Sequence, residues 1–502
     1  LWPALLVPTV TVGGVGLAAA GWSVRRLAPR LAARWADAWR RAGSALSGGL
    51  GRLVTPAGAV ASTLAAAALL VALRATPRLE LTAGEARAAL VTRDFGPWDS
   101  VRGTSCRIVR PGSGLDLSAL GSGRYAVTLW LSRAQPARQL PVVDVDGSSF
   151  AADLDANWQP LRLELAEVPF GRPGPVLRFA REARDVRLGR VEVERGGGVP
   201  APFGWLCGLL VGWLAALSPA ALGFSRRASW IAAGLGWACA VAACARDPIV
   251  AWPHLPGLAL VALAALALSV ALAAAGARPT PGACLAAVTG FAVWFGATTW
   301  PLYRGGHFGF HSQIAQEIWN GRFLIYFLPY PGSMLSQQAQ WGNVIVPHPC
   351  LFHTLAAPLA ALPGAWFPWA LKGCLALGLA SLALLAAVVA KRLAGPGAAT
   401  WAAAAFAALV PCHQLLGLGH LMTILGLWAG SLALAFLALR AHGLERRGPF
   451  WAGVGLLTLA FLSYTATLLF AGLLAIALVA RAWRREPATA GPLLRAVALA
   501  SL

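Results

Sequence analysis

Charge is scarce in this 502-residue chain: 12% of the residues are charged, whereas 58% are hydrophobic. Mean hydropathy is +0.64, and long apolar runs recur along the sequence. These features exclude an ordinary soluble protein. Because a helix of about 20 apolar residues spans the ~30 Å of hydrocarbon in a bilayer, the composition predicts an α-helical polytopic membrane protein.

Several functional signatures are also absent. The sequence has no phosphate-binding glycine-rich loop, no nucleotide-binding domain and no Ser-His-Asp order, which argues against an ATP-driven transporter. Its eight cysteines show no disulfide pattern, and we interpret them as small hydrophobic side chains. Gly208 and Gly212 form a GxxxG sequence, which predicts close packing between helices.

Lysine is almost missing, because Lys372 and Lys391 are the only two. Arginine therefore carries most of the positive charge behind the net charge of +21, and together with abundant alanine and glycine it suggests a GC-rich bacterial genome. The arginines cluster in short segments between apolar runs, where positive charge sets the orientation of a membrane protein. We therefore predict no binding of nucleic acid.

The apolar runs predict about 11 to 12 membrane spans. They fall at roughly 2–22, 56–74, 202–224, 228–245, 255–276, 280–300, 366–390, 397–412, 415–439, 449–463, 466–482 and 490 onward. The chain begins without a methionine and ends inside an apolar run, so we expect a fragment that is truncated at both ends. The first segment lacks the charged start and small-residue cleavage site of a signal peptide.

Arginine clusters predict the orientation of these spans. The segment after Gly21 contains seven arginines and one acid before residue 55, which places it in the cytoplasm. Alternation then places residues 75–200 and the loop 301–353 on the periplasmic side of a bacterial inner membrane. Leu351–Leu362 is short and contains Pro358, so we interpret it as re-entrant or interfacial; a full span there would invert everything after it.

Residues 75–200 differ from the rest, since they contain fifteen of the twenty carboxylates. Alternation of apolar and polar residues is typical of half-buried strands, and Asp146-Gly147 is a hairpin-turn dipeptide. Alternating stretches occur at Tyr125–Leu131, Leu140–Val145, Leu161–Leu165, Val176–Phe179 and Val186–Val193. The pattern predicts a periplasmic antiparallel β-sandwich, inserted between two N-terminal spans (1–74) and a multi-span membrane domain (201–502).

The segment from Leu302 to His353 concentrates the groups that carry chemistry. It holds four of the eight histidines, and long loops of this kind usually carry function. In the membrane domain, Asp247 and Glu317 are the only carboxylates on the predicted outer face. A carboxylate or an imidazole can take a proton from a reacting hydroxyl. The candidate catalytic residues are Glu317, His307, His311 and Asp247.

Each candidate also has a simpler interpretation. Glu317 lies in a predicted helix, HSQIAQEIW, and could be a surface charge, Asp247 could pair with Arg246, and the histidines could only satisfy hydrogen bonds. Four imidazoles with Glu317 could bind a divalent transition metal. Their spacing matches no established zinc signature, so we predict no metal ligand and leave the cofactor open.

Cations and aromatic residues around this segment suit a lipid-carrier phosphate and a sugar. Arginine offers a planar fork to phosphate, although it can also snorkel to headgroups. Aromatic rings can stack on a sugar, although aromatic belts are common at membrane interfaces. The candidate substrate-binding residues are Arg304, Arg322, Lys372, Tyr330, His348 and His353.

A set of short motifs runs through this segment and beyond it. They are Phe310–His311, Ile314, Ala315, Glu317–Ile318 and Gly321; Pro347-His348-Pro349 with Leu351 and His353; AAVVAKRLAGP at 386–396; Ser463-Tyr464-Thr465; and VRLGRVEVERG at 186–196. Together they resemble the first external loop, later segments and accessory β-domain of the GT-C superfamily, polytopic glycosyltransferases that use polyprenyl-phosphate-linked sugars. The resemblance covers roughly residues 281–482. His307 stands where this family normally has its catalytic aspartate.

The resemblance implies transfer of a sugar from a polyprenyl-phosphate-linked donor, which enters from the membrane lipid, to a glycan, lipid or protein acceptor at the periplasmic face. A base would deprotonate the acceptor while Arg304, Arg322 or Lys372 neutralises the departing phosphate. Two other classes stay open. One is a transporter or flippase for lipid-linked glycans, which needs polar residues within the spans. The other is a non-catalytic scaffold that binds surface glycan through residues 75–200.

Overall fold

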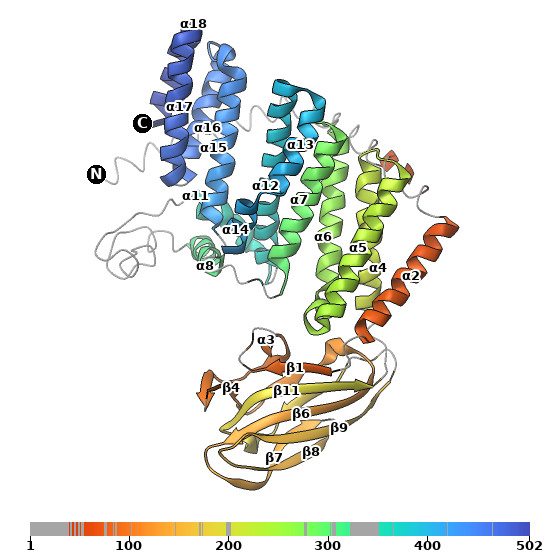
Figure 1. Ribbon diagram of the computed structural model, residues 1–502. Helices are drawn as coiled ribbons and strands as arrows, with labels where there is room; N and C mark the ends of the chain where they lie inside the picture. Colours follow the sequence, from red (N-terminus) through yellow and green to blue (C-terminus); the bar gives the residue numbers. More distant parts are fainter. Residues whose placement is uncertain are drawn as a thin grey trace, which may run out of the picture.

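The computed structural model consists of a β domain beside an array of long helices (Figure 1). It describes residues 40, 43–44, 47–48, 51, 55–74, 78–83, 85, 88–101, 103–145, 147–169, 172, 174–196, 202–275, 279–301, 303, 308–321, 351–364, 366–418, 420–463 and 465–501. The predicted first span, 2–22, lies outside these residues.

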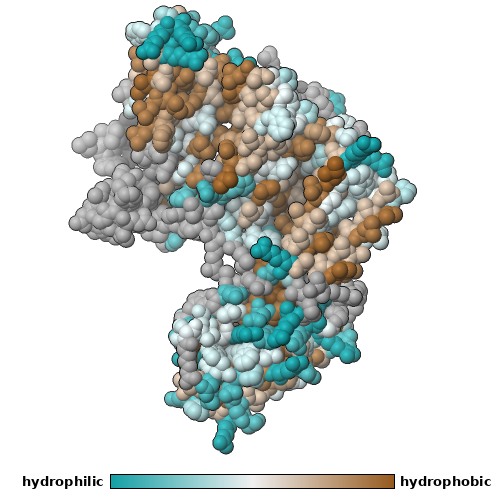
Figure 2. Space-filling model, viewed as in Figure 1, coloured by the Kyte–Doolittle hydropathy of each residue, from teal (hydrophilic) through white to brown (hydrophobic). Residues whose placement is uncertain are grey.

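Seven of the described helices are long and apolar enough to cross a membrane. They belong to α4 (Pro202–Ala221), α5 (Arg226–Arg246), α6 (Pro248–Ala274), α7 (Pro281–Thr299), α12 (Trp366–Ala394), α15 (Leu421–Arg440) and α17 (Thr465–Arg485). Figure 2 shows hydrophobic surface along the helices, between a hydrophilic β domain and a hydrophilic patch at the far end of the array. By the length and composition of its helices, the chain is a multi-pass membrane protein.

Several predicted spans have other boundaries in the structure. α2 (Pro56–Arg74), α16 (Arg447–Ser463) and α18 (Pro487–Ser501) lie where spans were expected, but α16 and α18 have only 17 and 15 residues. α6 begins at Pro248 rather than at 255, and the helix continues through Pro253 and Pro256. In a membrane protein, neighbouring helices and local adjustments compensate for the backbone hydrogen bonds that proline removes.

The predicted span 415–439 is present with a later start, but the predicted span 397–412 is not one continuous helix. The chain forms α13 (Pro396–Ala407), then α14 (Val410–Leu418), and α15 starts only at Leu421. The break follows from Pro411, which lacks the N–H that would reach the carbonyl of Ala407 four residues earlier. His413 Nε2 lies 3.1 Å from that carbonyl oxygen instead. α13 alone, at about 18 Å, is too short to span the bilayer.

The segment Leu351–Leu362 does not span the membrane either, as expected from its length. It forms α11 (Leu351–Ala356) and the 3₁₀ helix η3 (Ala357–Ala361). These two pieces together extend less than about 20 Å, against ~30 Å of hydrocarbon. The orientation of the later helices therefore does not invert at this point.

Basic side chains gather at one end of the helical array. Arg226 and Arg227 begin α5, Lys391 and Arg392 lie near the end of α12, and Arg440, Arg447 and Arg485 lie at the ends of α15, α16 and α17. The opposite end carries the β domain, because the domain follows the last turn of α2 and precedes the first turn of α4 (Figure 1). The basic clusters and the β domain therefore lie on opposite sides of the helices.

The GxxxG sequence of α4 packs closely, as predicted. A Cβ on Gly212 would lie 2.2 Å from Trp237 Nε1 of α5, and one on Gly208 would lie 3.0 Å from Leu69 of α2. The indole N–H of Trp237 donates to the carbonyl of Leu209 at 2.9 Å. A larger side chain at Gly212 would therefore push α5 away from α4.

The β domain consists of two antiparallel sheets around one apolar core. One sheet has the order β3-β4-β11-β6-β9, with β1 also paired to β11; the other has the order β2-β5-β10-β7-β8. The strands are β1 (Arg78–Thr82), β2 (Thr92–Arg93), β3 (Trp98–Val101), β4 (Thr104–Ile108), β5 (Gly114–Asp116), β6 (Gly123–Arg133), β7 (Ala137–Val145), β8 (Ser148–Leu154), β9 (Gln159–Val168), β10 (Val176–Phe179) and β11 (Val186–Gly196).

All five predicted strand stretches lie inside β6, β7, β9, β10 and β11. β7 and β8 pair as a hairpin through Val145 and Ser148. The two-residue connection includes Gly147 at φ 85°, a conformation that glycine adopts without strain; Asp146 lies outside the described residues. The prediction of an antiparallel sandwich at this position is therefore consistent with the sheets that form.

The β domain is connected to the membrane part through α2 and α4, and it also packs against α6. Ile249, at the start of α6, is 2% exposed and belongs to the apolar core of the β domain. α6 also contacts the 3₁₀ helix η1 (Ser118–Leu120) of that domain. The domain therefore contacts the N-terminal end of α6. His254 lies about one and a half turns further along the same helix.

A charged cluster stabilises the sheet around Glu192 of β11, which is 6% exposed. Its carboxylate accepts hydrogen bonds from Arg78 at 2.6 Å and from the Trp130 indole at 3.1 Å, and lies 2.6 Å from Arg190. Arg190 also pairs with Glu80 at 2.9 Å. The hydrogen bond from Arg78, with those from Trp130 and the charge of Arg190, holds the pKa of Glu192 below its usual value despite burial.

We expect Glu192→Gln to destabilise the β domain by about 1–3 kcal/mol, because the arginines lose their charged partner. The difference in free energy of unfolding between the wild type and the variant should be largest above the ordinary glutamate pKa of about 4.3. It should vanish as the pH falls through the lowered pKa of Glu192 in the folded state. Hydrogen exchange of β1, β6 and β11 in the full-length protein measures this. Glu167→Gln is the control, since its pair with Arg124 is exposed and such pairs contribute little.

Candidate functional site

The predicted helix HSQIAQEIW is present as α8 (Phe308–Trp319). His311, Ile314 and Ala315 are buried on one side, while Gln313 and Trp319 are exposed. Spacings of three and four residues place side chains on one face of a helix. α8 therefore turns a histidine, rather than its carboxylate, fully into the protein.

The buried side of α8 meets α11 through two histidines. His311 Nδ1 lies 3.0 Å from His353 Nε2, and the two rings are 4% and 0% exposed. The pair joins positions 42 residues apart in the chain, with the Phe352 ring 6.0 Å from that of His311. Neutral imidazole has one donor and one acceptor nitrogen, so one ring donates to the other and the pair can accept a proton on one side and release it on the other.

A lysine lies against two aromatic rings near α8. The ammonium of Lys372, in α12, lies 5.0 Å from the ring centroids of both Tyr303 and Phe308. Phe308 precedes His311 by one turn of α8, so the lysine and the histidine pair flank the same helix. Within the described part of the chain, no carboxylate forms an ion pair with Lys372.

Tyr303 connects this cation to α14. Its hydroxyl donates a hydrogen bond to the carbonyl of Leu416. Burial raises the pKa of Tyr303 to about 12, so the hydroxyl keeps its proton, and its role as donor, at neutral pH. The hydrogen bond to Leu416 fixes the position of the Tyr303 ring next to Lys372.

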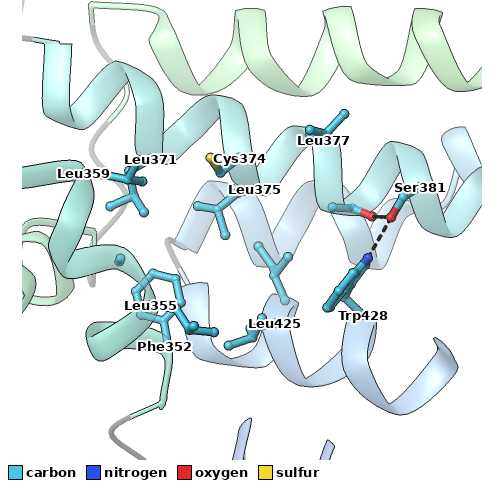
Figure 3. Close-up of a pocket in the computed structure, with 13 residues that line it drawn as sticks. Phe352, Leu355, Leu359, Leu371, Cys374, Leu375, Leu377, Ser381, Leu425 and Trp428 are labelled. Carbon is cyan, nitrogen blue, oxygen red and sulfur yellow. Dashed lines mark hydrogen bonds between the residues drawn. The ribbon is translucent and has the colours of Figure 1, made fainter. Parts of the chain in front are cut away.

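An apolar groove of about 490 Å³ lies among the helices that carry His353 and Lys372. It lies between α11–η3, α12 and α15 (Figure 3). Phe352, next to His353 in the chain, lines one part of it, and Leu371, next to Lys372, lines another. The other lining residues are Leu355, Ala356, Leu359, Cys374, Leu375, Leu377, Gly378, Ser381, Ile424, Leu425 and Trp428.

The groove is open at its side. Trp428 Nε1 donates to Ser381 Oγ at 2.7 Å, and both residues line the groove (Figure 3). Leu355 and Leu377 on its wall are 55% and 47% exposed, so the groove opens on the outer surface of the helices. From Leu371 to Ser381, α12 rises about 15 Å, so the groove extends from near the N-terminal end of the helix to its middle.

The structure brings together only some of the predicted site residues. His311, His353 and Lys372 lie around α8, whereas Asp247 lies at the N-terminus of α6, beside the β domain. Glu317 is partly buried on α8, six residues after His311 and therefore on another side of the helix. The other predictions, Arg304, His307, Arg322, Tyr330 and His348, lie outside the described residues.

Sequence reasoning missed other members of this region. Tyr303, Phe352 and the groove residues carried no local signal, because ordinary apolar patterning explains them. His254 did carry one, since an ionisable side chain among apolar membrane residues indicates a functional site. Its imidazole is 6% exposed, but the prediction that the span begins at 255 left this residue in a loop.

Among the described residues, no group of three or more histidine, cysteine, aspartate or glutamate side chains could hold a metal ion. The seven described cysteines are all free thiols. No family model matches the sequence, and neither a curated protein nor a solved structure matches it. The function is therefore inferred from the geometry of the site.

Proposed function

We propose that the protein is a membrane glycosyltransferase that moves a sugar from a polyprenyl-phosphate carrier to an acceptor on the outer face of a bacterial inner membrane. One observation carries the proposal: an apolar groove lies on the helices that also carry a buried pair of histidines and a lysine with no carboxylate partner among the described residues. A lipid chain suits the groove, because its walls are apolar and lie between membrane helices. The charged end of such a lipid would then lie near Lys372.

In the proposed reaction, the bond between the anomeric carbon and the phosphate oxygen breaks, and a bond from that carbon to the acceptor oxygen forms. The acceptor proton passes to the His311–His353 pair, as general base catalysis requires. The leaving polyprenyl phosphate keeps the electron pair, and Lys372 neutralises its charge. Glu317 and His307, which stands at the position of the family's aspartate, stay predictions for the same role.

The orientation follows from charge. Basic residues concentrate at the end of the helices away from the β domain, and positive residues favour the cytoplasmic side. This supports the proposal that the β domain, the groove mouth and α8 face the periplasm. We propose that the β domain holds the glycan, lipid or protein acceptor there, since it rests on α6 beside the site.

A flippase is the alternative that the groove disfavours. A flippase must pass a polar headgroup through the membrane, whereas the walls of the groove are apolar. A chain can enter such a groove, but a sugar phosphate gains no polar partners along it.

Purified protein in proteoliposomes, supplied with radiolabelled polyprenyl-phosphate glucose or mannose, tests the proposal. We expect release of polyprenyl phosphate with transfer of label to an acceptor extract or to water. A lectin accessibility assay on the same vesicles follows flipping. Movement of intact donor between leaflets without cleavage would contradict the proposal and support a flippase.

A further inference from the structure

His254 is a buried imidazole enclosed by aromatic rings. It is 6% exposed, and its ring lies 5.2 Å from that of Trp300 at 85° and 6.2 Å from that of Trp369 at 36°. Its Nε2 atom is buried and has no hydrogen-bond partner in the part of the chain that the structure describes. An unsatisfied buried polar atom costs free energy and calls for an explanation, such as a ligand.

Gly257 provides the space for the imidazole ring of His254. A Cβ on Gly257 would lie 2.7 Å from His254 Cε1 and 2.9 Å from Trp369 Cη2. Glycine at this position therefore allows the imidazole and the indole to lie against the backbone of α6. The sequence makes room for a polar ring inside a membrane helix, although an apolar side chain would avoid the unsatisfied nitrogen.

A cation lies one helical turn after the Trp369 indole that contacts this imidazole. Lys372 follows Trp369 by three residues on α12, which places the two on one face of the helix. Its ammonium lies 5.0 Å from the centroids of both the Tyr303 and Phe308 rings. Lys372 is partly exposed, so an anion can reach it from outside. His254 and Lys372 thus share Trp369 as a neighbour, on its ring and on its helix face, and no described carboxylate forms an ion pair with the lysine.

We infer that His254 and Lys372 form a phosphate subsite, with the lysine as the charge and His254 Nε2–H as the hydrogen-bond donor. The inference rests on the proposed function, because the phosphate is that of the lipid-linked donor whose chain occupies the groove. A phosphate oxygen accepts from the imidazole and neutralises the ammonium, which satisfies both groups. The histidine pair on α8 stays available for the acceptor proton.

Binding to the full-length protein in nanodiscs tests the subsite, with farnesyl phosphate and the neutral alcohol farnesol as probes. We expect the wild type to prefer farnesyl phosphate by about tenfold or more. His254→Leu and Lys372→Met should each remove most of this preference and leave farnesol affinity unchanged. His254→Gln, which keeps an amide donor and about the same size, should retain part of it and serves if the leucine variant does not fold.

His413→Gln is the matched control, because His413 is also in contact with a tryptophan ring but has the Ala407 carbonyl as partner. It should keep the wild-type preference. A competition arm with inorganic phosphate separates the sources: displacement of farnesyl phosphate at low millimolar concentration assigns the subsite to free phosphate as well as to the lipid. Displacement only by farnesyl phosphate assigns it to the lipid alone.

Equal preference in the wild type, His254→Leu and His254→Gln would overturn the inference, as would a wild type that does not distinguish the phosphate from the alcohol. The proposed function fails separately. A preference that depends on His254, in a protein that cleaves no sugar donor, would leave the phosphate subsite standing and remove the transferase.

Discussion

His353→Gln should lower sugar transfer by about 10²–10⁴-fold, the usual contribution of a general base. The glutamine amide can still hydrogen-bond to His311 Nδ1, so the contact between α8 and α11 is kept while the proton acceptor is lost. His311→Gln should have a similar effect, because the two rings share one hydrogen bond. Single-turnover assays with radiolabelled polyprenyl-phosphate sugar measure the chemical step.

The double variant separates a proton relay from two independent roles. Residues that act as a unit show strongly non-additive losses, so His311→Gln/His353→Gln should be no slower than either single variant. His442→Gln is the control, since His442 is exposed at the basic end of the array and pairs with Glu486 at 3.5 Å. Full activity in His353→Gln would exclude the pair from catalysis.

Gly378→Leu should weaken binding of the lipid chain by about tenfold or more, because it fills the groove. A Cβ on Gly378 would point toward Trp428, whose Cδ1 lies 4.0 Å away, so a leucine enters the space between α12 and α15. Leucine is also the better helix former, and α12 should stay intact. Equilibrium binding of farnesol, which lacks the phosphate, isolates this contribution.

Cys374 offers a second measurement of the same prediction. It lines the groove and its thiol is exposed, so a bound lipid should slow its reaction with a maleimide, followed residue by residue by mass spectrometry. Cys239, exposed on α5, is the internal control. Gly455→Leu is the matched variant, because a Cβ there meets nothing within 4 Å. Unchanged binding and labelling in Gly378→Leu would show that no chain enters the groove.

Much of the fold could be predicted from the sequence, because the signals were local. Apolar runs gave the helices that span a membrane, alternation gave β6, β7, β9, β10 and β11, and the spacing of His311, Ile314 and Ala315 agrees with one face of α8. The helix break at Ala408–Leu409 was missed, although Pro411 carries its cause. The start of α6 was also missed, since the helix includes Pro253 and Pro256, which packed membrane helices tolerate.

The candidate site was predictable only in part. His311, His353 and Lys372 were chosen because polar residues are rare in such a chain, and that argument does not depend on geometry. It could not separate them from Asp247, which the structure places beside the β domain, or identify His254, which lies in a run that was interpreted as a loop. The rarity of ionisable residues identifies candidates along the chain, but it gives no information on the distances between them in the fold.

Local chemistry alone thus determined where helices and strands form, where positive charge gathers and which ionisable residues stand out, because each depends on neighbours within a few residues. Tertiary packing alone decided that His311 meets His353 across 42 residues and that Tyr303 reaches Leu416 across 113. It also decided that α11, α12 and α15 leave an apolar groove between them. These contacts depend on how complete helices fit against one another, and no periodicity along a single segment encodes that fit.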